Sequence, residues 1–389
     1  MAVMKPSAIR EIFKNLGAPG AIAFSAGNPA PESFPVEAIK KISADILENN
    51  ATAALQYSVT EGYPRLRELV KKRIFEKFGV GREGDDTIIT SGGQQGIELT
   101  CKALCNPGDA VICENPSFIG ALNSFRSNGA RTVGVPLEDD GINLQKLEET
   151  LIKEGDKAKI IYVIPTFQNP AGITTSLEKR KAIYALAQKY DVVIIEDNPY
   201  GDLRFSGENI PTIKSMDTDG RVVYSGSFSK ILSAGMRVGF VCANAELIQK
   251  IVVAKQVEDV HTNIFFQMVC ADYMEKYNLD DHIETIRDLY RRKCTLMLSC
   301  LDEYFPKEVK YTRPEGGLFL WCTLPEKINL SDFIKRASDE KVFVVPGTAF
   351  NCDESAPSDS FRLNYSTPSD DDIRRGTKIL GDILKDMLK

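Results

Sequence analysis

The stretch Val192-Val193-Ile194-Ile195-Glu196-Asp197-Asn198-Pro199-Tyr200 decides the fold, because an apolar run rich in β-branched residues ends there in polar ones. Such a run is typical of a strand buried on both faces of a parallel sheet. Six similar runs lie between about Asp85 and Cys242. Stretches with apolar residues at helical spacing separate them, such as Gln94 to Leu104 and Leu177 to Tyr190. This alternation predicts βαβ units and a mostly parallel sheet covered by helices on both faces.

After Cys242 the predicted helices and strands no longer alternate as they do in the first part. From Ala245 to Phe305 the pattern is helical, and the charge-rich part, residues 277–293, predicts a long connecting helix. Short strands and helices follow, with strands expected near 309–311, 318–322, 342–345 and 361–365, and helices near 330–341 and 370–388. We predict an α/β protein with a three-layer α/β/α large domain, built on a mostly parallel sheet, and a smaller α+β domain. The expected boundaries are an N-terminal arm over 1–35 that joins the small domain, a large domain over 36–280 and a small domain over 281–389.

Composition excludes several classes of function. The 389 residues carry 48 Lys and Arg against 54 Asp and Glu, a net charge of −6, which gives no electrostatic reason to bind nucleic acid or an anionic membrane. No apolar stretch approaches the ~18 residues of a membrane span. Nine cysteines without a CxxC pair, and no signal-peptide pattern in residues 1–13, predict a reduced cytoplasmic protein. With two histidines, a His-rich metal site is excluded, and we expect no metal.

Ligands of open parallel sheets bind outside the carboxyl ends of the strands, so the residues that follow each run are informative. The glycine-rich turn Ser91 to Gly96 leads into a helix and is suited to a phosphate, although a tight βα turn explains it equally well. Phe118 follows the next run and would stack on a flat cofactor or pack in the core. Asn169, also beyond a strand, is a hydrogen-bonding residue or simply an Asn-Pro turn former.

Two further strand ends carry charged groups. Asp197 needs a partner because an unpaired buried charge is costly, and a protonated ring nitrogen, a salt bridge or a helix cap would each serve. Ser227-Phe228-Ser229-Lys230, with Arg237 beyond it, offers phosphate donors and one amine that desolvation would make nucleophilic, unless Lys230 is an ordinary surface lysine. Together, the five strand ends supply an anion cradle, an aromatic ring, an acid, an amide and a lysine. That set matches the needs of pyridoxal phosphate.

The order and spacing of these segments resemble the class I/II aminotransferases, which are fold type I pyridoxal-phosphate enzymes. The likeness covers nearly the whole chain, and its most specific segments are Leu55-Gln56-Tyr57, Ser91 to Gly96, Asn169 to Gly172, Asp197 to Tyr200, and Ser227 to Lys230 with Arg237. The resemblance implies that the catalytic residues are Lys230, Asp197 and Tyr200. It implies that the cofactor is bound by Ser91, Gly92, Gly93, Gln94, Phe118, Asn169, Asp197, Tyr200, Ser227, Ser229, Lys230, Arg237 and Tyr57. It implies that the substrate is bound by Arg362, Asn169, Gly27 and Arg10.

The same resemblance implies an activity and an assembly. The enzyme would move an amino group from an L-amino acid to a 2-oxo acid through a Lys230 Schiff base and pyridoxamine phosphate, in amino acid metabolism and biosynthesis. Tyr57 resembles the residue that reaches the phosphate of a neighbouring subunit, which implies a homodimer with shared sites. The segment Ser7 to Ile12 is similar to the 2-aminoadipate/kynurenine aminotransferase subgroup. There Arg10 would meet a side-chain carboxylate, and an exposed helical arginine is the alternative.

Three other functions are alternatives to an aminotransferase. A pyridoxal-phosphate-dependent C–S lyase of the cystathionine type would use the same lysine and aspartate. A ligand-sensing domain of a transcription regulator would bind the cofactor without turnover, but the roughly 90 residues before the glycine-rich turn hold no helix-turn-helix or basic recognition helix. A nicotinamide-dependent oxidoreductase is disfavoured, because Gly92-Gly93-Gln94-Gln95-Gly96 lacks the GxGxxG spacing.

Overall fold

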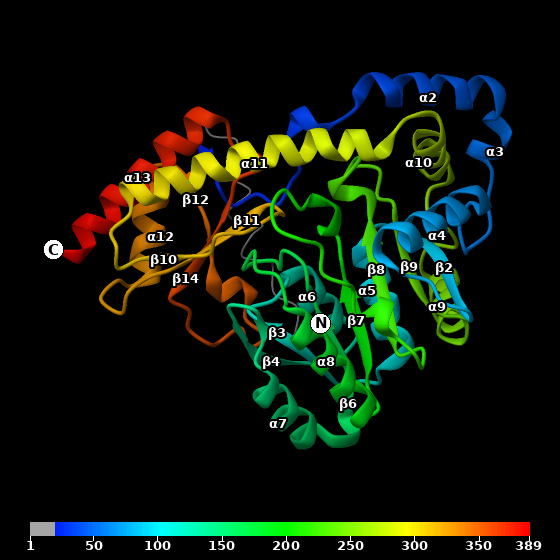
Figure 1. Ribbon diagram of the computed structural model, residues 1–389, viewed down its shortest axis with the longest axis horizontal. Helices are drawn as coiled ribbons and strands as arrows, with labels where there is room; N and C mark the ends of the chain where they lie inside the picture. Colours follow the sequence, from blue (N-terminus) through cyan, green and yellow to red (C-terminus); the bar gives the residue numbers. More distant parts are fainter. Residues whose placement is uncertain (1–19) are drawn as a thin grey trace.

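An eight-stranded sheet forms the centre of the molecule in the computed structural model, which describes residues 20–389 (Figure 1). The strand order is β2-β9-β8-β7-β6-β3-β4-β5. Strands β4, β3, β6, β7 and β8 run parallel to one another. Strand β9 is antiparallel to both β2 and β8, and β5 is antiparallel to β4. The strands are β2 Asp85–Thr90, β3 Ala110–Asn115, β4 Arg131–Glu138, β5 Gly141–Ile142, β6 Ala158–Val163, β7 Val193–Asp197, β8 Val222–Ser227 and β9 Gly239–Asn244.

Both faces of this sheet are buried, as the uninterrupted apolar runs predicted. In β6, Tyr162 belongs to one core cluster and its neighbour Ile161 to another, because successive side chains of a strand point to opposite faces. Helices α5 and α6 bury residues in the first cluster, and α7 and α8 in the second. The helices around the sheet are α4 Pro64–Phe78, α5 Gly93–Leu104, α6 Ile119–Ser127, α7 Leu144–Glu154, α8 Leu177–Lys189, α9 Ala245–Glu258 and α10 Ile264–Lys276. The prediction of an α/β/α arrangement is confirmed.

One long helix, α11 (Leu279–Tyr304), runs along the molecule and connects this sheet to a smaller α+β unit (Figure 1). Asn278 caps its start by accepting hydrogen bonds from the backbone of Asp280 and Asp281. Beyond the charge-rich residues 277–293, Met297 and Leu301 continue its buried apolar stripe, and the helix ends at Tyr304, next to the predicted end of the helical pattern at Phe305.

The smaller unit is built on a four-stranded sheet of order β10-β11-β14-β13, against which α12 and α13 pack. Its β1 and β12 form a separate parallel pair, so the segment from residue 20 onward lies with the C-terminal part of the chain. The domain boundaries themselves stay a prediction. The remaining elements are β1 Ile22–Ala23, α2 Val36–Asn49, α3 Ala51–Leu55, β10 Lys310–Tyr311, β11 Phe319–Thr323, α12 Leu330–Asp339, β12 Val342–Phe343, β13 Val345–Pro346, β14 Ser360–Asn364 and α13 Asp370–Leu388. Short 3-10 helices cover Pro31–Ser33, Gly155–Lys157, Gly201–Leu203, Lys214–Met216, Phe228–Lys230 and Gly347–Phe350.

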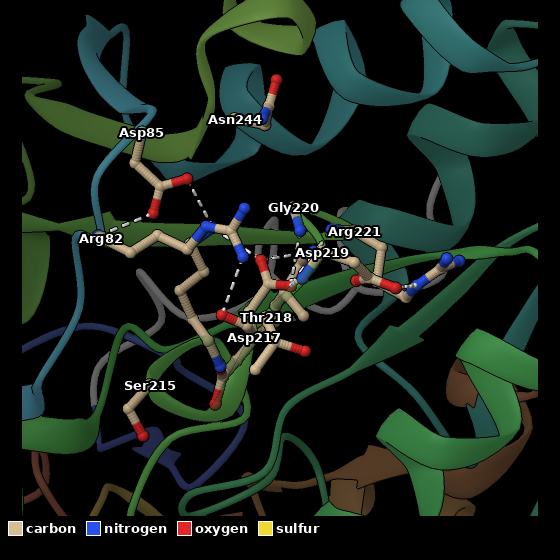
Figure 2. A network of polar contacts seen from close by, with 12 residues as sticks. Arg82, Asp85, Ser215, Asp217, Thr218, Asp219, Gly220, Arg221 and Asn244 are labelled. Carbon is tan, nitrogen blue, oxygen red and sulfur yellow. Dashed lines mark hydrogen bonds and ion pairs between the residues drawn. The ribbon is translucent and has the colours of Figure 1, made fainter.

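A buried polar network closes the edge of the large sheet at which β2, β7 and β8 begin (Figure 2). Lys214 donates hydrogen bonds to Asp85 and Asp217, both at 2.9 Å. Asp217 also accepts from the backbone of Gly220 at 2.9 Å and of Val222 at 3.3 Å. The network connects the segment between β7 and β8 to the start of β2. It lies at the edge of the sheet opposite the edge where the parallel strands end. No helix among residues 20–389 combines the length and apolar character needed to cross a membrane.

Candidate active site

A cavity of about 360 Å³ opens where the parallel strands end, between the large sheet and β11 and β14 of the smaller unit. Twelve of the predicted site residues line it: Gly27, Gly93, Gln94, Phe118, Asn169, Asp197, Tyr200, Ser227, Ser229, Lys230, Arg237 and Arg362. They come from segments up to 335 residues apart in sequence (362 − 27). The parallel topology explains the convergence, because the carboxyl ends of parallel strands meet at one edge.

Lys230 lies in the short 3-10 helix that follows β8, and its Nζ donates a hydrogen bond to the carbonyl oxygen of Gly27 at 2.8 Å. Burial of the ammonium group, and then the positive charges of Arg362 and Arg237, lower the pKa of Lys230 to about 8. A larger fraction of the amine is therefore neutral near physiological pH than in an exposed lysine. Only the neutral amine is a nucleophile or a base, so this cavity makes Lys230 reactive.

Asp197 is the last residue of β7 and is 4 % exposed. The hydroxyl of Tyr162 donates a hydrogen bond to its Oδ2 at 2.8 Å. Burial raises the pKa of Asp197 to about 7, and the Tyr162 hydrogen bond opposes that rise. A carboxylate with this little solvent needs a cationic partner to remain ionised, and such a partner would have to enter through the cavity.

Arg362, on β14, brings an unpaired guanidinium into the cavity. Its Nη1 donates to Oδ1 of Asn169 at 2.8 Å and its Nη2 to the carbonyl oxygen of Ser25 at 3.0 Å. Its buried Nε has no hydrogen-bond partner, and no acidic side chain among residues 20–389 forms an ion pair with it. The group lies 4.2 Å from the ring centroid of Phe319 and 5.0 Å from that of Phe350. A buried cation supported by neutral groups and aromatic faces is a site for a carboxylate ligand.

Anion donors gather at the start of α5 and after β8. Gly92 precedes α5 with φ of +81°, and a Cβ there would lie 2.3 Å from Nη2 of Arg237. Only glycine therefore lets the guanidinium approach the helix start, where backbone N–H groups are free. Arg237 also lies 3.5 Å from the Ser229 hydroxyl, which accepts a hydrogen bond from Ser227 at 2.8 Å.

An aromatic wall and a phenol complete the cavity. Phe118 precedes α6, and a Cβ on Gly120 would lie 2.4 Å from its ring, so the glycine keeps the ring in place. The side chain of Gln94 donates to the carbonyl oxygen of Gly120 at 2.6 Å and so ties α5 to α6. Tyr200 is 5 % exposed, and its burial raises the pKa of the phenol, which therefore stays protonated.

Three predicted site residues, Ser91, Gly92 and Tyr57, lie outside the cavity wall. The hydroxyl of Ser91 donates to Asp259 at 2.8 Å, and its carbonyl oxygen accepts from Arg237 at 3.3 Å, so Ser91 supports the turn without facing the cavity. Gly92 provides the turn itself. Tyr57 is 82 % exposed and meets only the edge of His261 among the ring contacts of the described residues. Arg10 lies outside the described residues.

Sequence reasoning missed Tyr162, which contacts Asp197 directly. It lies inside a strand, where an aromatic residue signals only core packing. The available signal was the register of β6 against β7. Tyr162 pairs with Ile195, and Asp197 lies two residues further on the same face.

The donor set fits the cofactor that the sequence resemblance implies. Asp197 is the one acidic residue that residues 20–389 contribute to the cavity wall, which Gly93 and Arg237 also line. Asp197 would suit a basic ring nitrogen, and Gly93 with Arg237 would suit a phosphate. Lys230 would supply the amine, and Arg362 would suit a carboxylate. No cluster of metal-ligating side chains occurs in the part of the chain that the structure describes.

Comparisons with known proteins agree with this geometry. The family model described as "Aminotransferase class I and II" matches residues 19–380. The chain is 42 % identical to an aromatic-amino-acid aminotransferase of Thermococcus litoralis, covering 99 % of this chain and 93 % of that protein. It is 38 % identical to a 2-aminoadipate transaminase of Thermus thermophilus, covering 99 % and 95 %. The crystal structure of a Pyrococcus horikoshii kynurenine aminotransferase, in complex with PMP, superposes with a TM-score of 0.95 at 39 % identity, covering 99 % and 96 %. The chain therefore belongs to the class I and II aminotransferases and is a pyridoxal-phosphate-dependent enzyme.

Proposed function

We propose that this aminotransferase moves an amino group from an L-amino acid to a 2-oxo acid, with Lys230 as the residue that moves the proton. The supporting observation is that one cavity holds a lysine of lowered pKa and, beside it, the carboxylate-free guanidinium of Arg362. Bound pyridoxal phosphate supplies a carbonyl for the amino group and a ring that withdraws electrons from the reacting carbon.

Each remaining residue has a proposed task in that reaction. Arg362, oriented by Asn169, holds the α-carboxylate of the substrate in a bidentate manner and so directs its α-hydrogen toward Lys230. Asp197 keeps the ring nitrogen protonated. Asn169 and Tyr200 hydrogen-bond the ring oxygen, and Phe118 stacks on the ring. Phosphate is held by Gly93, Gln94, Ser227, Ser229 and Arg237, with the turn at Ser91 and Gly92 behind them.

We propose that the amino donors have aromatic or long side chains. The support is that the related enzymes from Thermococcus, Thermus and Pyrococcus are named for aromatic amino acids, 2-aminoadipate and kynurenine. In this chain Gly27 lines the cavity beside Phe319 and adds no side chain to that part of the wall. Arg10 stays a candidate for reading a side-chain carboxylate.

We propose that the enzyme is a homodimer in which Tyr57 reaches the phosphate of the partner subunit. Large apolar side chains are exposed beside Tyr57: Leu55 is 75 % exposed and Val59 51 %. Val257 is 81 % exposed at the end of α9, close in sequence to His261, which contacts Tyr57. A surface of this kind is normally covered in a soluble protein, and a second copy would cover it. We also propose that it is a cytoplasmic enzyme of amino acid biosynthesis, and the nine free thiols support the reducing compartment.

The half-reaction tests the proposal. The purified enzyme is loaded with pyridoxal phosphate and mixed, without a 2-oxo acid, with a panel of phenylalanine, kynurenine, 2-aminoadipate, glutamate and leucine. Stoichiometric formation of pyridoxamine phosphate and the matching 2-oxo acid is expected, fastest with the aromatic or long donors. Release of pyruvate and ammonia from cystathionine would instead identify a lyase. An unchanged ratio of 2-aminoadipate to leucine rates in Arg10→Ala would remove Arg10 from the site.

A further inference from the structure

Tyr162 is the structural partner of Asp197. It lies on β6, next to β7, and its register partner Ile195 is two residues before Asp197. Paired residues of parallel strands, and residues two apart in one strand, point to the same face, so the phenol and the carboxylate face each other. The distance from the Tyr162 hydroxyl to Oδ2 of Asp197 is 2.8 Å, and both residues are buried.

No other hydrogen bond to this carboxylate occurs among the described residues. Oδ2 of Asp197 accepts the hydrogen bond from Tyr162, and Asp197 lines the cavity. Its other oxygen, Oδ1, is therefore available to a ligand. The ring of Tyr162 is itself fixed, because it meets Phe125 of α6 edge-on at a centroid distance of 5.3 Å. The phenol also stays protonated, since burial and the charge of Asp197 raise its pKa well above the ordinary value. Tyr162 is therefore a rigid donor aimed at one oxygen.

We infer that Tyr162 is a positioning residue that holds Asp197 ionised and oriented toward the ring nitrogen of the cofactor. The inference rests on the proposed role of Asp197 at that nitrogen. A hydroxyl that donates to a carboxylate favours its charged form and fixes its rotation. Without this hydrogen bond, burial would raise the pKa of Asp197 further. The carboxyl group would then be protonated and could not stabilise a proton on the ring nitrogen.

The test measures how tightly cofactor-free protein binds two ligands. One is pyridoxal phosphate, and the other is its analogue in which the ring nitrogen is replaced by CH. In Tyr162→Phe we expect about tenfold weaker binding of pyridoxal phosphate, the usual effect of losing a hydrogen bond to a charged group. We expect the affinity for the analogue to change less than about twofold, because the analogue has no protonated nitrogen for Asp197 to contact. Equal weakening of both ligands would overturn the inference and show that Tyr162 only packs.

A matched control comes from Tyr184, whose buried hydroxyl also contacts a carboxylate, Asp217, at 3.3 Å, but on the opposite face of the sheet. Tyr184→Phe should alter neither ligand's affinity. In an Asp197→Asn background, Tyr162→Phe should have no further effect on pyridoxal phosphate, because the two residues act as one unit. An additional tenfold loss in that background would contradict the inference.

Two further measurements separate the possible failures. If wild-type protein binds pyridoxal phosphate and the analogue with equal affinity, the proposed role of Asp197 fails. If wild type prefers pyridoxal phosphate and Tyr162→Phe shows the same preference, only the role of Tyr162 fails. If Tyr162→Phe does not fold, 3-fluorotyrosine at position 162 replaces it. Its more acidic phenol should strengthen binding of pyridoxal phosphate and leave the analogue unchanged. No gain in binding would then count against Tyr162.

Discussion

Nη1 of Arg362 donates a hydrogen bond to Oδ1 of Asn169 at 2.8 Å, which joins β14 of the smaller unit to the loop after β6 of the large sheet. The amide orients the guanidinium but adds no negative charge. Desolvation lowers the pKa of Arg362 to about 10, so the group is still a cation at neutral pH. One contact thus keeps a buried positive charge available for a carboxylate and couples the two sheets at the cavity.

Replacing Arg362 by leucine should lower kcat/KM for every amino donor by about 100-fold or more, because a buried charge-assisted pair with the α-carboxylate is lost. Arg362→Lys should recover only part of the loss, since an ammonium cannot make the bidentate contact. Steady-state kinetics with two donors test this. Arg313→Leu is the control, because Arg313 is exposed and pairs with Asp302 at the surface. An unchanged kcat/KM in Arg362→Leu would show that the substrate carboxylate binds elsewhere.

Lys230→Ala should reduce the rate of pyridoxamine phosphate formation by about 10³-fold or more, because residues 20–389 place no second amine in the cavity wall. Single-turnover absorbance after mixing with an amino donor measures that rate. Lys181→Ala, an exposed position on α8, should leave it unchanged. Borohydride treatment of the holoenzyme should label Lys230 in wild type. Labelling elsewhere, with activity retained in Lys230→Ala, would refute the assignment.

Uptake of pyridoxal phosphate by cofactor-free enzyme should depend on pH through Lys230. Only the neutral amine attacks the aldehyde, so the rate should rise as pH increases and level off above about 8, the lowered pKa of Lys230. Stopped-flow absorbance between pH 6 and 10 would follow it. Removing the positive charge in Arg362→Leu should move the midpoint upward, because that charge lowers the pKa of Lys230. A midpoint that stays near the ordinary lysine value in wild type would contradict this.

Tyr57→Phe tests the shared site. If the Tyr57 hydroxyl reaches the partner's phosphate, its loss should weaken pyridoxal phosphate about tenfold and leave pyridoxal, which has no phosphate, unchanged. Equilibrium binding by fluorescence distinguishes the two ligands. Analytical ultracentrifugation should find a dimer in both wild type and variant. Equal affinity of wild type and Tyr57→Phe for pyridoxal phosphate would place the hydroxyl away from the phosphate.

Stability should depend on the network at the far edge of the sheet. Asp217→Asn removes the charge that Lys214 meets in a fully buried site, so we expect a loss of about 3 kcal/mol in the free energy of unfolding. Asp219→Asn, whose partner Arg221 is partly exposed, should cost less than about 1 kcal/mol. Urea unfolding of cofactor-free protein measures both. KM should not change in either variant, because the network lies away from the cavity. A loss below about 1 kcal/mol in Asp217→Asn would show that Asp85 alone satisfies Lys214.

The sequence was sufficient for the large sheet and for one side of the cavity. Apolar runs that end in Asp197 or in Ser227 to Lys230 identify both a buried strand and the polar residues at its end, because parallel strands direct those ends to one edge. Arg362 and Tyr57 were reached only through the family resemblance. Nothing in the local pattern of β14 or of the segment after α3 marks a ligand contact.

Tertiary structure alone decided which residues meet. The pairing of Tyr162 with Asp197 depends on the register between β6 and β7. Arg362 is a buried cation because β14 packs over the loop of Asn169. Periodicity along a chain predicts which face of an element a residue lies on and where a strand ends. It does not predict which distant side chain a residue contacts, because the packing of the whole molecule determines that contact.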